Sequence, residues 1–281
     1  MNRLLTTLAL AALTLTPNTT AAQKQLTILH SNDTHSCILP LKAQLADTAV
    51  AGRGGFLRRI AMLREERQKD PDLLYFDSGD FSQGSSYYTM FQGNVEIGLM
   101  NQMGIDAATI GNHEFDFGLD NMARLFTMAN FPIVCSNYDF ADTELAHIVK
   151  PYITLKRKGV KIGVFALCPP LKGLVTANNY GPLRFLDPAE TAQRMVSLLR
   201  DKKKCDLVVC ISHLGWEVTD YPDQRMIEHT NGIDLVLGGH SHTYFDKLEY
   251  ASDKDGKPVA VDQNGKHGAF IGKLTLTLDK R

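Results

Sequence analysis

The chain lacks three features that would place it in a specialised class of protein. It has no cluster of basic charge, because 30 lysine and arginine residues stand against 31 aspartate and glutamate residues and the formal net charge is −1. Nucleic-acid binding is therefore not expected. No segment approaches the roughly 20 apolar residues of a membrane-spanning helix, so membrane insertion is not expected either. Low-complexity linkers and internal repeats are also missing, and alternating strand-like and helical stretches indicate one α/β domain.

The first residues have the pattern of a secretory signal peptide. Arg3 provides a basic start, residues 4–15 form a short apolar stretch, and small residues follow at positions 20–22. No cysteine follows the expected cleavage region, which argues against a lipid-anchored lipoprotein. We predict a signal peptide over residues 1–22, export as a periplasmic or secreted protein, and one domain over residues 23–281.

Five short segments rich in metal-binding side chains each follow an apolar run. The runs cover residues 26–29, 73–76, 107–110, 207–211 and 233–237, and each is interpreted as a buried strand. If these strands share a sheet, their carboxyl ends deliver the five segments to one edge. The side chains concerned are Asp33, His35, Asp80, Asn112, His113, His213, His240 and His242.

These ligand types favour divalent transition metals. Neutral imidazole and carboxylate suit zinc, manganese, iron or cobalt, and no thiolate lies within the five segments. A carboxylate can bridge two ions about 3.5 to 4 Å apart, and such a pair can bind the attacking and leaving oxygens of a displacement at phosphorus. Any one of these residues alone is more simply structural; Asp33 or Asn112, for example, would be read as a helix N-cap. Their joint occurrence favours two-ion phosphoester hydrolysis.

Five strings resemble, in order and spacing, the metallophosphoesterase (calcineurin-like) domain of secreted 5'-nucleotidases. They are LTILHSNDTH, LYFDSGDFSQGS, TIGNHEFDFG, VVCISHLG and VLGGHSHT. The resemblance covers roughly residues 25–280, and five ordered motifs make it specific. It implies an α/β fold of the metallophosphoesterase type, a four-layer sandwich with two mixed β-sheets flanked by helices. The metal site is then expected at the carboxyl ends of strands, and residues 23–281 form the catalytic domain.

The resemblance also implies a role for each site residue. Asp80 would bridge two divalent metal ions, the first bound by Asp33, His35 and His242 and the second by Asn112, His213 and His240. His113 and Asp116 would form a catalytic pair, with the imidazole facing the phosphate and the carboxylate fixing its tautomer. Asp116 can reach His113 across one helical turn. We expect direct attack of a metal-activated hydroxide without a covalent enzyme intermediate.

The expected activity is release of phosphate from nucleoside monophosphates or related small phosphomonoesters. No part of the chain resembles the second domain that recognises the nucleotide in this family. Three alternatives follow and stay open at this point. The protein is a broad phosphatase, a catalytic or metal-binding subunit whose recognition domain is a separate partner protein, or an enzyme for another phosphoester, such as a cyclic-nucleotide or nucleotide-sugar phosphodiesterase.

The remaining histidines and the first long helix are interpreted as structural. His30 is placed beside the first motif, either orienting ligands or packing, whereas the others are expected on the surface or in loops: His147, His229 and His267. Residues 52–55 predict a turn before a helix over residues 56–68. That helix should bury Phe56, Ile60 and Leu63 and expose its arginines.

The five cysteines leave at least one unpaired. Cys205 and Cys210 would lie about 16 Å apart in an extended run, too far for a disulfide. Cys135 and Cys168 fall in apolar segments and are interpreted as buried hydrophobic residues. Cys37 follows His35 closely, where it is either a loop residue or a residue with a ligand or redox role.

Overall fold

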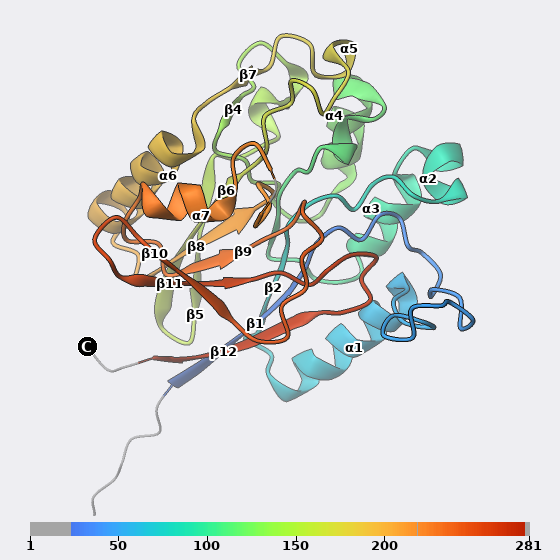
Figure 1. Cartoon of the computed structure of the whole chain (residues 1–281), viewed down its shortest axis with the longest axis horizontal. Coiled ribbons are helices and arrows are strands. Elements are labelled where there is room, and N and C mark those ends of the chain that lie inside the picture. The colour runs from blue at the N-terminus through green and yellow to red at the C-terminus, as the bar shows by residue number, and fades with distance from the viewer. Residues whose placement is uncertain (1–23, 218, 279–281) are drawn as a thin grey trace, which may run out of the picture.

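Two mixed β-sheets form the centre of the molecule (Figure 1). The computed structural model describes residues 24–217 and 219–278. The first sheet has the order β12 (Gly272–Leu278), β1 (Lys24–Ser31), β2 (Leu74–Asp77) and β3 (Ala107–Ala108). The second has the order β10 (Glu249–Ser252), β11 (Pro258–Asp262), β9 (Leu235–Leu237), β8 (Leu207–Ser212), β6 (Val160–Leu167) and β5 (Tyr152–Arg157). In each sheet the central strands are parallel and an outer strand is antiparallel.

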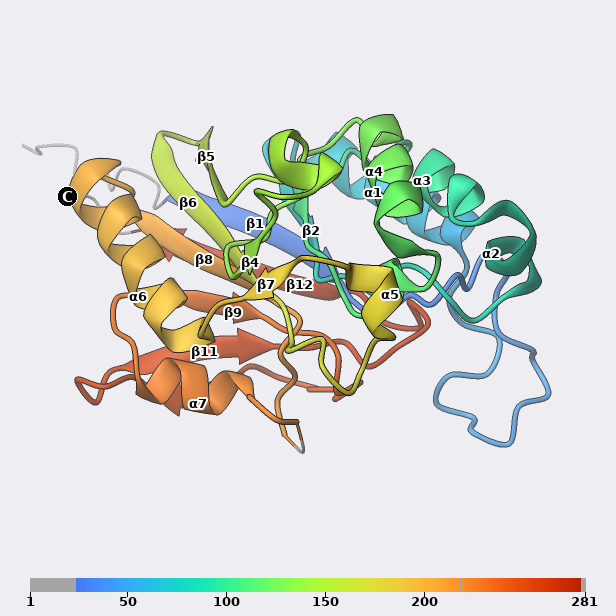
Figure 2. The ribbon, with the colours of Figure 1, turned by 90° about the horizontal axis from the view of Figure 1, so that it is seen from above.

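Helices cover the outer faces of the two sheets (Figure 2). The α-helices are α1 (Phe56–Lys69), α2 (Ser86–Phe91), α3 (Asn94–Met100), α4 (Gly118–Met128), α5 (Ala177–Tyr180), α6 (Pro188–Ser197) and α7 (Asp223–Glu228). The shorter elements are η1 (His113–Phe115), η2 (Glu144–His147), the π-helical turn η3 (Leu198–Lys202) and a two-stranded ribbon of β4 (Tyr138–Asp139) and β7 (Arg184–Phe185).

Side-chain alternation along the strands creates three hydrophobic cores. Ile28 of β1 and Val209 of β8 belong to one cluster that joins the two sheets. The neighbouring residue Leu29 belongs to a second cluster, with α1 and α4, and Val208 belongs to a third, with α6 and α7. Because adjacent strand residues point to opposite faces, both faces of each sheet are buried. The result is the predicted sandwich of helix, sheet, sheet and helix.

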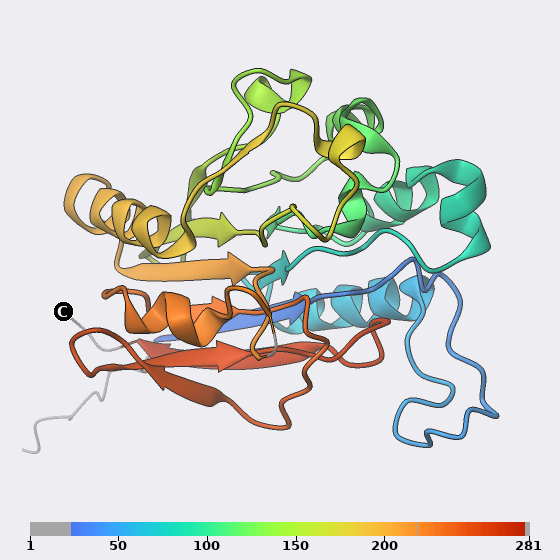
Figure 3. The ribbon, with the colours of Figure 1, turned by 45° about the horizontal axis from the view of Figure 1, so that its top comes forward.

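The five predicted strands are all present, but they do not share one sheet. β1, β2 and β3 lie in the first sheet, whereas β8 and β9 lie in the second. The condition that would collect all five segments at one sheet edge is therefore not met, and the strands divide between the two mixed sheets that the family resemblance implied. The two sheets pack face to face, and their long strands β1 and β8 point the same way (Figure 3). Because β2 and β3 run parallel to β1 and β9 runs parallel to β8, the carboxyl ends of all five strands still meet on one side of the molecule.

Helix α1 follows its prediction except at one arginine. It begins after Gly55, whose φ of 91° a side chain would disfavour, and it buries Phe56, Ile60 and Leu63. Arg59 is not exposed as expected: only 5% of it is accessible, and its guanidinium carbon lies 4.1 Å from the centre of the Phe56 ring. Stacking on an aromatic face lets a delocalised cation be buried.

No helix in the described ranges is long and apolar enough to cross a membrane. The predicted signal peptide, residues 1–22, lies outside those ranges.

Candidate metal centre

Three predicted ligands from β1 and β9 meet in one group. Asp33 and His35 follow the end of β1, and His242 follows the end of β9. Asp33 Oδ1 lies 3.4 Å from His242 Nε2 and 3.8 Å from His35 Nε2. The two imidazole Nε2 atoms are 2.9 Å apart. One atom from each residue lies within 4.8 Å of the others, a spacing that one cation can span.

A second group forms beside the first around Asp80, which follows β2. His213 Nε2, directly after β8, lies 3.2 Å from Asp80 Oδ2 and 3.9 Å from Asp33 Oδ1. His240 completes the group, with its ring centre 5.1 Å from that of His213. Asp80 also groups with His35 and His113. A carboxylate between two sets of ligands is the arrangement that a bridging residue requires.

Several ligand atoms are buried without a hydrogen-bond partner. Asn112 Oδ1, His35 Nδ1 and His213 Nε2 are in this state. Each buried polar atom without a hydrogen-bond partner destabilises the folded state by about 1–3 kcal/mol, so a cluster of them indicates a bound ligand. His213 Nδ1 lies 2.6 Å from Ser78 O and donates to it, so that Nε2 is the nitrogen that faces the carboxylates and could bind a cation. The donor set therefore fits divalent metal ions.

The protonation of the imidazoles agrees with this fit. Burial lowers the pKa of His35, and burial together with the charge of His213 lowers the pKa of His240 to about 4. Both are neutral at pH 7, the form that binds metals. Burial lowers the pKa of His213, but Asp80 and Asp33 outweigh it and raise that pKa well above its ordinary value. A cation bound there would displace the proton.

The backbone of the ligand loops is strained. Five of the seven candidate ligands have positive φ: Asp33 at 47°, His35 at 43°, Asp80 at 53°, His240 at 72° and His242 at 55°. Left-handed backbone at residues other than glycine costs on the order of 1–2 kcal/mol each and clusters at functional sites. The fold therefore holds these side chains in orientations that an ordinary loop would not adopt.

Two glycines allow the loops to approach closely. A Cβ on Gly111 would overlap the carboxylate of Asp80. A Cβ on Gly239 would lie 2.9 Å from His213 Nδ1 and 3.1 Å from Asp33 Oδ2. The glycines in the TIGNHEFDFG and VLGGHSHT motifs thus serve packing between ligand loops.

The predicted catalytic pair is in contact at the rim of this cluster. His113 Nδ1 lies 3.2 Å from Asp116 Oδ2, and η1 brings the two residues together within one turn. The His113 ring centre is 5.5 Å from that of His35. Burial lowers the pKa of His113, but the Asp116 hydrogen bond and the Asp80 charge outweigh it and raise that pKa. About a third of each side chain is accessible, so His113 can meet a ligand.

Sequence reasoning missed Glu114, which joins two ligand loops. Its fully buried carboxylate accepts the backbone N–H of Asp80 at 2.9 Å and of Gly111 at 2.6 Å through Oε2, and that of Ser82 at 3.1 Å through Oε1. Burial and the Asp80 charge raise the pKa of Glu114 to about 7. The sequence shows an acidic residue next to His113 and gives no signal of these contacts.

His267 was expected on the surface or in a loop; it lies in a loop, and this loop reaches the ligand cluster. Its ring centre lies 5.9 Å from that of His35, and its backbone N–H donates to Asp33 O at 2.7 Å. The pairing of β11 with β9 brings the following loop, which contains His267, to the metal centre. The sequence did not indicate this pairing. His30, in contrast, is completely buried and lies 2.8 Å from Asp262. His147 and His229 are exposed as predicted.

A pocket of about 420 Å³ adjoins the catalytic pair. Asp116, Gln83, Tyr88 and Phe117 contribute to its lining. The Tyr88 and Phe117 rings lie 5.1 Å apart, and 39% of Phe117 is accessible. This opening provides room for an organic group beside Asp116.

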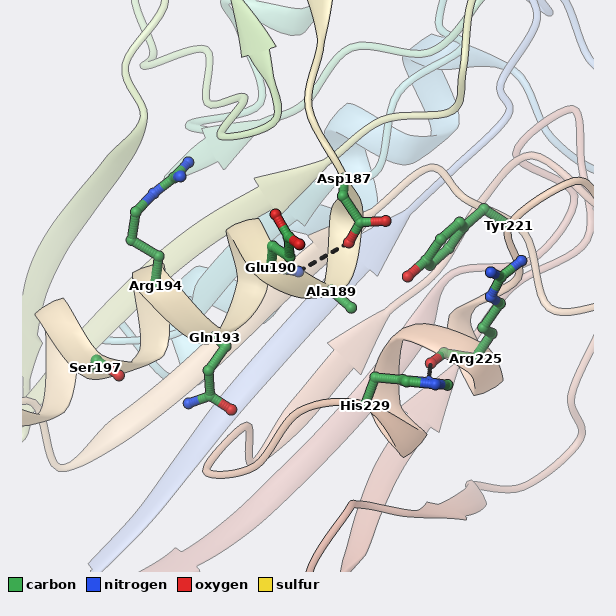
Figure 4. A pocket seen from close by; sticks show the side chains of 9 residues that line it. All are labelled: Asp187, Ala189, Glu190, Gln193, Arg194, Ser197, Tyr221, Arg225 and His229. Carbon is green, nitrogen blue, oxygen red and sulfur yellow. Dashed lines mark hydrogen bonds between the residues drawn. The ribbon is translucent and has the colours of Figure 1, made fainter.

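A separate pocket between α6 and α7 contains none of the candidate ligands (Figure 4). Its side chains carry mixed charge: Asp187, Glu190 and Arg194 come from α6 and its N-cap, and Arg225 comes from α7. Arg225 stacks on Tyr221 at 4.5 Å. These groups balance one another, and we assign no role to this pocket.

Comparison with known proteins now identifies the family. Residues 26–244 match the family model described as calcineurin-like phosphoesterase. The chain belongs to the calcineurin-like phosphoesterase family. The predicted resemblance and the predicted α/β fold are therefore confirmed. Members of this family use divalent metals, in agreement with the His and Asp groups described above.

Three relatives show how far the similarity extends. The trifunctional nucleotide phosphoesterase protein YfkN of Bacillus subtilis is 31% identical over 91% of this chain and 18% of its own length. The structure of a 5'-nucleotidase precursor from Thermus thermophilus has a TM-score of 0.81 at 30% identity, over 91% of this chain and 52% of that one. The NAD nucleotidase NadN of Haemophilus influenzae has a TM-score of 0.77 at 27% identity, over 90% and 47%. The chain thus spans between 18% and 52% of the length of these three relatives.

Proposed function

We propose that this calcineurin-like phosphoesterase is a dinuclear phosphohydrolase similar to 5'-nucleotidases. It would release phosphate from nucleoside monophosphates or related small phosphomonoesters. The observation that carries the proposal is the convergence of the two adjacent ligand groups with a histidine–carboxylate pair at their rim. The names of the relatives, 5'-nucleotidase and nucleotide phosphoesterase, favour a nucleotide as the substrate class.

The seven ligand candidates would share the two ions as the sequence motifs suggest. Asp80 would contribute to both, while Asp33, His35 and His242 would hold one ion and Asn112, His213 and His240 the other. When bound, two such cations lower the pKa of water toward about 7 and neutralise phosphate oxygens. The strained loops and the hydrogen bond from His213 to Ser78 O would orient the ligand atoms before any ion binds.

His113 and Asp116 would act on the leaving group. Asp116 would accept a hydrogen bond from the Nδ1–H of His113 and so fix its tautomer, which directs Nε2 away from the carboxylate. The Asp116 hydrogen bond and the Asp80 charge raise the pKa of His113 and so favour its protonated form, from which Nε2 could donate to a phosphate oxygen or to the departing alkoxide. The pocket beside Asp116 would accommodate the organic part of the substrate.

The test is hydrolysis by the purified chain after removal of metals and reloading with manganese or zinc. The substrates are AMP, UMP, a sugar phosphate, a cyclic nucleotide and UDP-glucose. We expect metal-dependent phosphate release with preference for the nucleoside monophosphates. Turnover of the cyclic nucleotide or UDP-glucose alone would replace the proposal with a phosphodiesterase. No turnover with two ions bound would favour a subunit that needs a separate recognition partner.

We also propose that the protein is exported, on the basis of the signal-peptide pattern in residues 1–22. Expression in a bacterial host should yield a processed chain that begins near residue 23 in the periplasm or medium. N-terminal sequencing of the recovered protein measures this, and an unprocessed chain retained in the cytoplasm would contradict export.

A further inference from the structure

Two buried cysteines from distant parts of the sequence are in direct contact. Cys135 and Cys168 are separated by 33 residues, and their Sγ atoms lie 3.4 Å apart. Cys135 is 3% accessible and Cys168 is inaccessible. The prediction that both are buried hydrophobic residues is confirmed, but the sequence gave no sign that they meet.

The backbone around both thiols is fixed by hydrogen bonds. The Cys168 N–H donates to Asn137 Oδ1 at 2.9 Å, and Asn137 Nδ2 donates to Cys168 O at 2.8 Å. The Cys135 N–H donates to Lys150 O at 3.0 Å, and the Ser136 N–H donates to Ala166 O at 2.8 Å. The two segments therefore run side by side. The sulfurs must approach by about 1.4 Å to reach the bonded distance of about 2.05 Å.

The other three cysteines are placed differently. Cys37 Sγ donates to Leu39 O at 3.2 Å in the first loop. Cys205 and Cys210 belong to one run, before and within β8, and no contact between their sulfurs is found in the described ranges. Among the five thiols, Cys135 and Cys168 are the pair positioned for a bond.

We infer that Cys135 and Cys168 are a disulfide-forming site. The bond would form when the chain folds in the presence of a disulfide oxidant such as oxidised glutathione. Both S–H bonds break and one S–S bond forms, while two electrons and two protons reduce the oxidant disulfide to two thiols. Because the native fold shields both thiols, oxidation takes place during folding or local opening.

The disulfide would stabilise the segments that pack against the metal-ligand loops. Thr109 Oγ1 lies 3.5 Å from Cys168 Sγ and donates to Val134 O at 2.8 Å. Thr109 is three residues before the candidate ligand Asn112. The bond would therefore tie the end of β6 to the segment that packs against the Asn112 loop. A cross-link over this separation restricts the unfolded chain and should raise Tm by on the order of 10 °C.

The experiment compares the full chain refolded with oxidised glutathione or with a reductant. Each sample is then denatured and alkylated, and its mass and cysteine peptides are measured. We expect the oxidised sample to be about 2 Da lighter before alkylation, with a linked Cys135–Cys168 peptide and three alkylated cysteines. Five alkylated cysteines in the oxidised sample, or a link from Cys168 to Cys210, would overturn the inference. This mass measurement needs no enzymatic activity, so a failed nucleotidase assay leaves it intact.

Serine variants supply the matched controls. Cys135→Ser and Cys168→Ser should each abolish the linked peptide and the difference in Tm between oxidised and reduced protein, whereas Cys205→Ser should retain both. If a serine variant does not fold, the peptide map of the unaltered chain still decides the matter. An oxidised-minus-reduced Tm difference that survives in folded Cys135→Ser would contradict the assignment.

Discussion

Glu114 should control metal affinity although it is not a ligand. Its carboxylate holds three backbone N–H groups, from Asp80, Gly111 and Ser82, and thereby joins the loops that present Asp80 and Asn112. In Glu114→Gln, the amide oxygen can keep the two bonds that Oε2 accepts, but the amide nitrogen then faces the Ser82 N–H. In Glu114→Ala, all three buried N–H groups lose their acceptor.

The expected effects are graded. One buried N–H without an acceptor raises the free energy of the folded state by about 1–3 kcal/mol. Three such groups raise it by about 3–6 kcal/mol if the loops relax in part. Groups that support ligands typically change metal affinity by about 10–100-fold when mutated. We therefore expect about 10-fold weaker binding for Glu114→Gln and about 100-fold or more for Glu114→Ala. Burial raises the pKa of Glu114 to about 7, so its charged form is unfavourable in the folded protein. Because each substitution also removes this unfavourable charge, the free energy of unfolding is a poor measure of the lost hydrogen bonds.

The assay is competition of the metal-free protein with a chromophoric chelator for zinc or manganese. Glu65→Gln is the matched control, because Glu65 is exposed on α1 and should bind metal like the unaltered chain. Binding by Glu114→Ala within twofold of the unaltered chain would refute the reasoning that this carboxylate holds the ligand loops in place.

Three further predictions concern the same site. His113→Asn should lower turnover by about 100-fold or more with unchanged metal content, as measured by phosphate release and metal analysis. The control His147→Asn should have no effect, and equal turnover of the two variants would remove the role of His113. Gly111→Ala should abolish tight metal binding, because the new Cβ overlaps the Asp80 carboxylate, and calorimetric titration with normal affinity would contradict this packing. Removal of metals by a chelator should lower Tm, because a metal at 100 times its Kd stabilises the folded state by about 2.7 kcal/mol. An unchanged Tm in scanning calorimetry would argue against a metal site within the fold.

The sequence predicted the ligand segments because each combines an apolar run with adjacent donor side chains. The same local reasoning connected Asp116 to His113, and the 3.2 Å contact within η1 is the distance expected one turn apart. Helix α1 was also predictable from its apolar face, apart from Arg59, whose burial depends on stacking against Phe56. The local sequence pattern therefore predicts the strands before the ligand segments, helix α1 and the identity of the ligand candidates.

What the sequence did not indicate depends on contacts between distant segments. The division of the five strands between two sheets arises from pairing partners such as β12 and β11, which no periodicity identifies. His267 reaches the site through a backbone hydrogen bond to Asp33, and Glu114 acts through backbone groups of three other residues. The contact of Cys135 with Cys168 likewise requires two segments to run side by side. In each case the determining interaction is long-range in the chain.

Anomalous diffraction from crystals of the chain reloaded with zinc would test the two-ion centre most directly. The account predicts two peaks about 3.5 to 4 Å apart, with Asp80 between them. Asp33, His35 and His242 should surround one peak, and Asn112, His213 and His240 the other. A single peak, or peaks bound by other residues, would contradict the central claim.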